Sequence, residues 1–148
     1  MFKGIKDNWK KAEAAAVIEA ALTDMRQAGT YDRDPAKGAN AIVQKAWETQ
    51  PEIFDGRSGV RPHKLTVAIV SMSMMVENMN PESDYFTPFM VSLGVMLQGA
   101  AANATQLGFT RTDEHLIEQV AGIYERLSAV HLSDELSAEI ASMTNHRW

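Results

Sequence analysis

The chain has 148 residues, of which 45% are hydrophobic and 22% charged, and its net charge is −5. This composition is typical of one globular domain with a buried core, and it excludes a wholly disordered chain. Because the chain has no cysteine, it also excludes disulfides, thiolate catalysis and zinc sites built on cysteine.

The first predicted helix runs from about Lys3 to Gln27, and Gly29 ends it. Its apolar side changes partway along, at 100° per residue. The later stripe, which we expect to meet the core, consists of Val17, Ile18, Ala21, Leu22 and Met25. The early stripe consists of Phe2, Ile5, Trp9, Ala12 and Ala16. Three alternatives stay open for the early stripe: its own bundle, another protein chain, or a membrane surface.

The second predicted helix begins at Asp34-Pro35, an N-cap followed by proline at the first helical position, and ends before Pro51. Residues 51–62 are expected to form a loop anchored by Ile53 and Phe54. Pro62 opens a third helix that reaches about residue 79. Its main apolar stripe is Leu65, Ala68, Ile69, Met72, Met75, Val76 and Met79, and a second stripe on the far side is Val67, Val70 and Met74. A helix with two apolar sides should lie between two layers or contact another chain.

The next helix is the most informative element, because no charged side chain occurs from Tyr85 to Thr110. The periodic part covers about residues 88–107, and Gly108 has the position of a C-cap. A helix without a charged side is usually covered all round. The sequence therefore predicts an all-α fold in which about six helices surround a buried central helix at about 88–107, in a single domain over residues 1–148.

Two further helices, of which the last is short, complete the predicted bundle. Thr112-Asp113-Glu114 is expected to cap the fifth helix, and Ser133-Asp134-Glu135 the sixth. The polar cluster at the start of the fifth helix includes His115 and Glu118, three residues apart, which are the one pair that could act in an enzyme. Capping already explains the acidic residues there. Neither the Glu-x-x-His pairs of metal-binding bundles nor a phosphate-binding glycine motif occurs, so we predict no metal and no cofactor.

Six of the nine methionines lie between Met72 and Met96. Methionine packs into irregular cores, and it also suits adaptable binding surfaces. Ordinary core packing is the simpler interpretation for those on the helical stripes. The alternative is an apolar, metal-free ligand pocket formed by Met72, Met75, Met79 and Met96.

The sequence thus favours a non-catalytic, soluble helical protein that acts through protein–protein contacts and self-associates as a homodimer. An acidic inhibitor or immunity-type protein falls within this class, because the acidic residues are concentrated in the second half of the chain. The predicted contact residues are Phe2, Ile5, Trp9, Val67, Val70 and Met74. The alternative function is binding of an apolar small molecule in the methionine-lined pocket, and the third is an enzyme using His115 and Glu118. We expect no nucleic-acid partner, and a cytoplasmic location because no secretory signal is visible.

Overall fold

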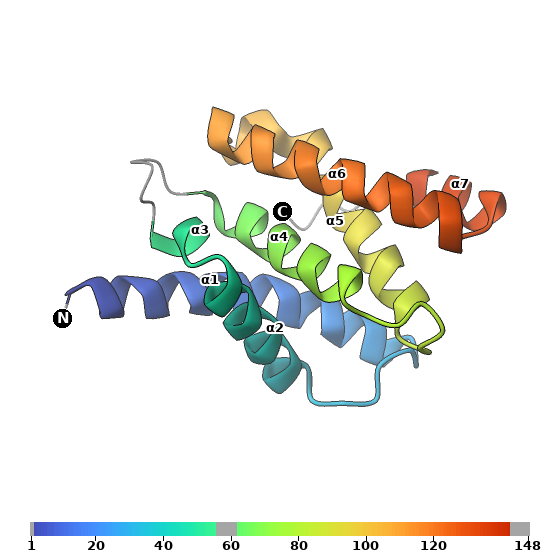
Figure 1. Cartoon of the computed structure of the whole chain (residues 1–148), viewed down its shortest axis with the longest axis horizontal. Coiled ribbons are helices and arrows are strands. Elements are labelled where there is room, and N and C mark those ends of the chain that lie inside the picture. The colour runs from blue at the N-terminus through green and yellow to red at the C-terminus, as the bar shows by residue number, and fades with distance from the viewer. Residues whose placement is uncertain (1, 56–61, 143–148) are drawn as a thin grey trace.

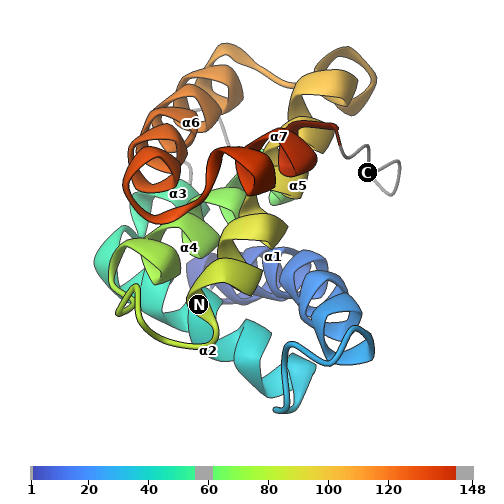
Figure 2. The same cartoon turned by 90° about the vertical axis from the view of Figure 1, so that its right-hand side faces the viewer.

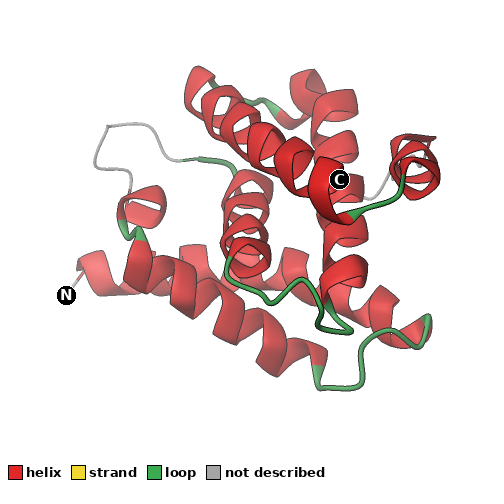
Figure 3. Cartoon of the chain, turned by 45° about the vertical axis from the view of Figure 1, so that its right-hand side comes forward, coloured by secondary structure: helices red, strands yellow, loops and turns green. Residues whose placement is uncertain are grey.

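The chain folds entirely into helices over the residues that the structure describes (Figures 1 and 3). The computed structural model describes residues 2–55 and 62–142, and the side chains of residues 10–54 and 62–142. Within these ranges there are seven helices: α1 (Phe2–Gln27), α2 (Pro35–Thr49), α3 (Glu52–Asp55), α4 (Lys64–Glu77), α5 (Phe86–Leu107), α6 (Arg111–His131) and α7 (Asp134–Ser142). The predicted all-α fold is confirmed.

The helix ends follow local sequence signals. The Asp34 carboxylate accepts a hydrogen bond from the Ala36 N–H, and Pro35 stands at the first position of α2, as predicted. Gly108 ends α5 in the left-handed conformation, with φ of 71°, and its N–H reaches the Ala104 and Thr105 carbonyls. Only glycine takes this conformation at little cost, so the predicted C-cap is confirmed as well.

The start of α6 differs from the prediction by two residues. Thr110, and not Thr112, is the N-cap, and it forms a capping box with Asp113. A box requires an acceptor three residues after the cap, which the Thr110-x-x-Asp113 spacing supplies. The segment 51–62, expected as a loop, contains the single turn α3. Its predicted anchors Ile53 and Phe54 are buried, whereas residues 56–61 lie outside the described part of the chain.

The helices form two groups with α4 between them (Figures 1 and 2). The first group is α1 packed on α2, with α3 beside them. The second group is α5, against which α6 and α7 pack. Because α4 contacts α1 and α2 on one side and α5 and α6 on the other, both groups share it.

This position explains the two apolar sides of α4. Leu65, Ala68, Ile69 and Met72 are buried, and so are Val67 and Val70 from the opposite stripe. The structure therefore gives the most complete enclosure to α4. Helix α5 is buried along one side, while Gln98, Ala101, Ala102 and Thr105 are exposed on the other. A neutral sequence marks the lack of a charged side, but it does not by itself place a helix at the centre.

The later part of α1 turns its apolar side to the core, as predicted. The later stripe is buried in the core: Val17, Ile18, Ala21, Leu22 and Met25. Of the early stripe, Ala12 and Ala16 are exposed. Among the described residues, no helix combines the length with the apolar character that crossing a bilayer requires.

Candidate functional site

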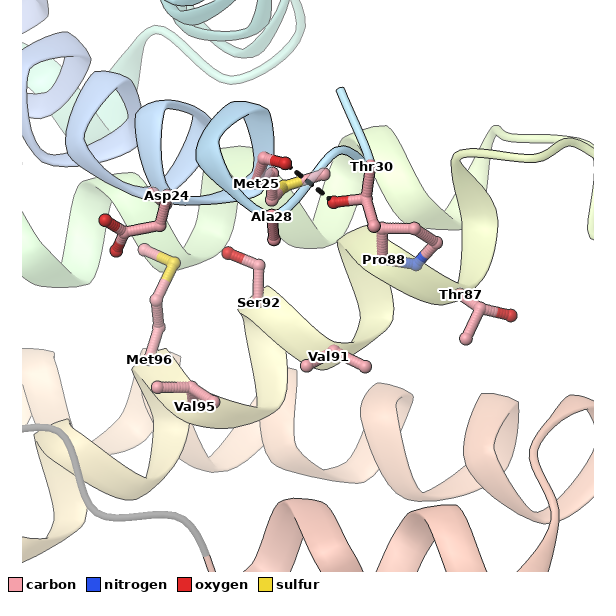
Figure 4. A pocket seen from close by; sticks show the side chains of 11 residues that line it. Asp24, Met25, Ala28, Thr30, Thr87, Pro88, Val91, Ser92, Val95 and Met96 are labelled. Carbon is pink, nitrogen blue, oxygen red and sulfur yellow. Dashed lines mark hydrogen bonds between the residues drawn. The ribbon is translucent and has the colours of Figure 1, made fainter. Parts of the chain in front are cut away.

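An apolar groove lies between the C-terminal end of α1 and the first half of α5 (Figure 4). Its volume is about 390 Å³, within the range of small-molecule sites in proteins. Apolar side chains make most of its wall, and the polar residues of the lining are Asp24, Thr30, Thr87 and Ser92. The lining residues are Ala21, Asp24, Met25, Ala28, Thr30, Thr87, Pro88, Val91, Ser92, Val95 and Met96.

The groove follows from the spacing of residues along two helices. Helix α5 contributes residues three or four apart, which share one side of a helix. Helix α1 contributes Ala21, Asp24 and Met25, and then the chain turns away at Gly29 with φ of 82°. The Thr30 hydroxyl donates a hydrogen bond to the Met25 carbonyl at 3.0 Å, which holds this turn against the end of α1. Small residues at Ala21 and Ala28 leave the space unfilled.

One end of the groove adjoins a polar pocket of about 440 Å³. The two share Thr30 and Pro88. The polar pocket is lined by Gly29, Thr30, Tyr31, Asp32, Ser83, Asp84, Tyr85 and Pro88. It lies where the α1–α2 loop meets the turn before α5, two segments that are distant in sequence.

A hydrogen bond joins these two segments. The Tyr85 hydroxyl donates to the Asp32 carboxylate. This bond lowers the pKa of Asp32 and raises that of Tyr85, so the carboxylate stays charged and the phenol neutral at pH 7. The Arg33 guanidinium stands 5.6 Å from the centre of the Tyr85 ring, a distance at which a cation is attracted to an aromatic face.

A second polar site joins the starts of α4 and α6, and we call it the helix-start junction: His63, Thr110 and Asp113. The Asp113 carboxylate is 2% exposed and accepts hydrogen bonds from the His63 N–H at 2.7 Å and the Thr110 N–H at 3.0 Å. Burial alone would raise the pKa of Asp113, but the donated hydrogen bonds outweigh it and leave that pKa below its usual value. The carboxylate is thus the hydrogen-bond acceptor for backbone N–H groups at the starts of both helices. We therefore interpret the junction as a structural feature and not as a binding site.

His63 caps α4 through its ring. The Nδ1 atom accepts a hydrogen bond from the Leu65 N–H at 3.0 Å, which requires that nitrogen to be unprotonated. Burial lowers the pKa of His63, and Lys64 and Lys10 act in the same direction, whereas Asp113 and Glu13 oppose them. The net direction is downwards, so the folded chain binds this proton less readily than the unfolded chain does.

We therefore expect acid to weaken the fold through His63. The stability contributed by the neutral ring is present above about pH 6.5, the ordinary histidine pKa, and is lost as the pH falls through the lower folded-state pKa. Urea unfolding at several values between about pH 7.5 and pH 5.5 measures this slope. His63→Asn keeps a capping side chain without a titrating ring, so its slope should be smaller. An unchanged slope would show that other groups carry the acid sensitivity.

The four methionines predicted as a pocket have different positions. Met96 lines the α1–α5 groove, together with Met25, which the sequence did not single out for ligand binding. Met72 is fully buried, Met79 is half-buried, and Met75 is 39% exposed. These three do not line the groove.

The predicted contact residues divide into two sets. Val67 is 1% exposed and Val70 is 7% exposed, because the chain itself covers them, while Met74 is half-buried. A subunit could reach the two valines only if this packing opened. The side chains of Phe2, Ile5 and Trp9 lie outside the described residues, so their role in self-association stays a prediction.

The His115 and Glu118 side chains are both exposed on α6. The His115 Nε2 atom lies 3.3 Å from the side-chain amide nitrogen of Gln119, one turn further along the helix. The part of the chain that the structure describes contains no cluster of three or more His, Asp or Glu side chains that could hold a metal ion.

Comparison of the chain with protein-family models, with curated proteins and with solved structures finds no match.

Proposed function

We propose that this protein is a non-catalytic helical binding protein that holds an aliphatic small molecule in the groove between α1 and α5. The observation that carries the proposal is the groove itself: about 390 Å³, mainly apolar in its lining, and with one wall formed by α5, a helix without charged side chains. Apolar cavities of this size with a few polar groups are the usual form of small-molecule sites.

The exposure of α5 supports this proposal. Val91 and Val95 line the groove and are only half-buried. A helix side that meets water ordinarily carries charged or polar residues, yet this side carries valines. An apolar ligand would cover them and remove the cost of their contact with water.

The length of the groove indicates the length of the ligand. From Thr87 to Met96 the lining follows α5 for about 14 Å, at 1.5 Å per residue. An extended hydrocarbon chain of about ten carbons has a comparable length. Met25 and Met96 have flexible side chains that can adapt to such a chain.

The first experiment measures binding of 1-decanol by calorimetry and by thermal unfolding, with a charge placed in the groove as the test. Val91→Lys should weaken binding at least about tenfold, because the lysine either fills the groove or brings an ammonium group into it. The matched control is Val130→Lys on α6, where the valine is 75% exposed and outside the groove. The control should bind like the unmodified protein.

Light scattering on the same samples tests the predicted self-association. If the unmodified protein is a dimer that Val91→Lys dissociates, and 1-decanol does not bind, the groove is a subunit interface and the small-molecule proposal is wrong. Saturable binding that raises the unfolding temperature and is lost only in Val91→Lys supports the proposal, since a ligand at 100 times its Kd adds about 2.7 kcal/mol of stability.

A further inference from the structure

The polar pocket at the end of the groove, lined by Tyr31, Asp32, Asp84 and Tyr85, has the composition of a cation site. It offers two carboxylates and two phenol rings. Carboxylates attract cations, and the faces of tyrosine rings attract ammonium groups within about 6 Å. The pocket and the apolar groove share Thr30 and Pro88 in their linings, so the two spaces adjoin at these residues.

A cationic side chain of the protein already contacts one of the rings that line this pocket. The Arg33 guanidinium lies over the Tyr85 ring, and Tyr85 in turn donates its hydroxyl hydrogen to Asp32. That bond uses one of the acceptor sites of the Asp32 carboxylate, which has further lone pairs for a second donor or cation. An anionic head group in this pocket would meet the Asp32 and Asp84 carboxylates.

We propose that the ligand is a cationic amphiphile, whose aliphatic chain lies in the α1–α5 groove and whose ammonium group lies in the pocket of Tyr31, Asp32, Asp84 and Tyr85. This inference rests on the proposed function, because the aliphatic part of the same molecule occupies the groove. It adds the sign of the head group and the end of the groove at which that group binds.

The test compares three probes with ten-carbon chains and different heads: decyltrimethylammonium, 1-decanol and decanoate. Each is titrated by calorimetry below the concentration at which it forms micelles. We expect decyltrimethylammonium to bind about tenfold more tightly than 1-decanol, as one weak cation–ring contact and attraction to two carboxylates would produce. Decanoate should bind most weakly.

Arg33→Gln gives the sharper result, because the inference predicts a gain of binding. Removing the guanidinium frees the Tyr85 ring and takes away a positive charge near Asp32, so the affinity for decyltrimethylammonium should rise about two- to fivefold. Arg126→Gln on the exposed surface of α6 makes the same change in net charge and should have little effect. A gain of binding does not arise from misfolding.

A second matched pair removes one negative charge. Asp84→Asn should weaken decyltrimethylammonium binding about two- to fivefold and leave 1-decanol binding unchanged. Glu118→Gln, which removes a charge from the exposed surface of α6, should leave both unchanged.

Equal affinities for the ammonium and alcohol probes would overturn the inference and leave the proposed function intact. So would tighter binding of decanoate, or the same shift in Arg33→Gln and Arg126→Gln. If none of the three probes binds, both proposals are wrong.

Discussion

Asp113→Ala is expected to lower the free energy of unfolding by about 2–4 kcal/mol, because it removes a buried acceptor shared by two helices. The Asp113 carboxylate accepts from the His63 N–H at the start of α4 and from the Thr110 N–H at the start of α6. Alanine would leave both donors without this partner and would break the capping box. Urea unfolding at pH 7 measures the loss.

Glu114→Ala is the control for that change. Glu114 is the next residue in the same first turn of α6, but its side chain is exposed. Its loss should lower the free energy of unfolding by less than about 1 kcal/mol, the usual contribution of an exposed charge near a helix start. Equal losses for the two variants would contradict the view that Asp113 acts by bridging α4 and α6.

Gly94→Ala is expected to destabilise the protein by about 1–3 kcal/mol, even though alanine favours helices more than glycine does. A Cβ atom at Gly94 would stand 2.5 Å from Ile140 Cγ2 and 2.7 Å from the Tyr124 hydroxyl oxygen. Ile140 is only 2% exposed, so α7 must shift away from α5 to admit the new methyl group. Thermal and urea unfolding measure the change.

Gly122→Ala is the control, and we expect it to stabilise the protein. This glycine lies inside α6, and a Cβ atom there would meet nothing within 4 Å. Because only helix propensity changes, the free energy of unfolding of this variant should rise by up to about 1 kcal/mol. If both alanines stabilise the protein, the close packing of α5 against α7 does not limit residue 94.

The helices could be predicted from local signals, and the positions of their ends show why. Asp34-Pro35 determines where α2 begins and Gly108 where α5 ends, each through the backbone conformation of one or two residues. Both predictions were right. At α6 the predicted cap was Thr112, two residues too late, because the hydrogen bonds between Thr110 and Asp113 form the actual cap. The single turn α3 has too few residues for a periodic pattern to appear.

The groove could not be predicted, because it depends on how two helices meet. Met25 and Val95 are 70 positions apart in the sequence, and nothing local to either shows that they line one space. The neutral character of α5 was the available signal, but we interpreted it as burial at the centre of the bundle. In the structure the same neutral surface is in part the wall of the groove.

The place of α4 also bears on how the chain assembles while it is being synthesised. The N-terminal group, α1 and α2, reaches α4 as its next long helix, so these three can pack as soon as residues up to Glu77 have emerged. The side of α4 that later meets α5 and α6 then stays in contact with water until about 50 more residues have followed. Nascent chains of that intermediate length would carry an open apolar surface of the kind that chaperones bind.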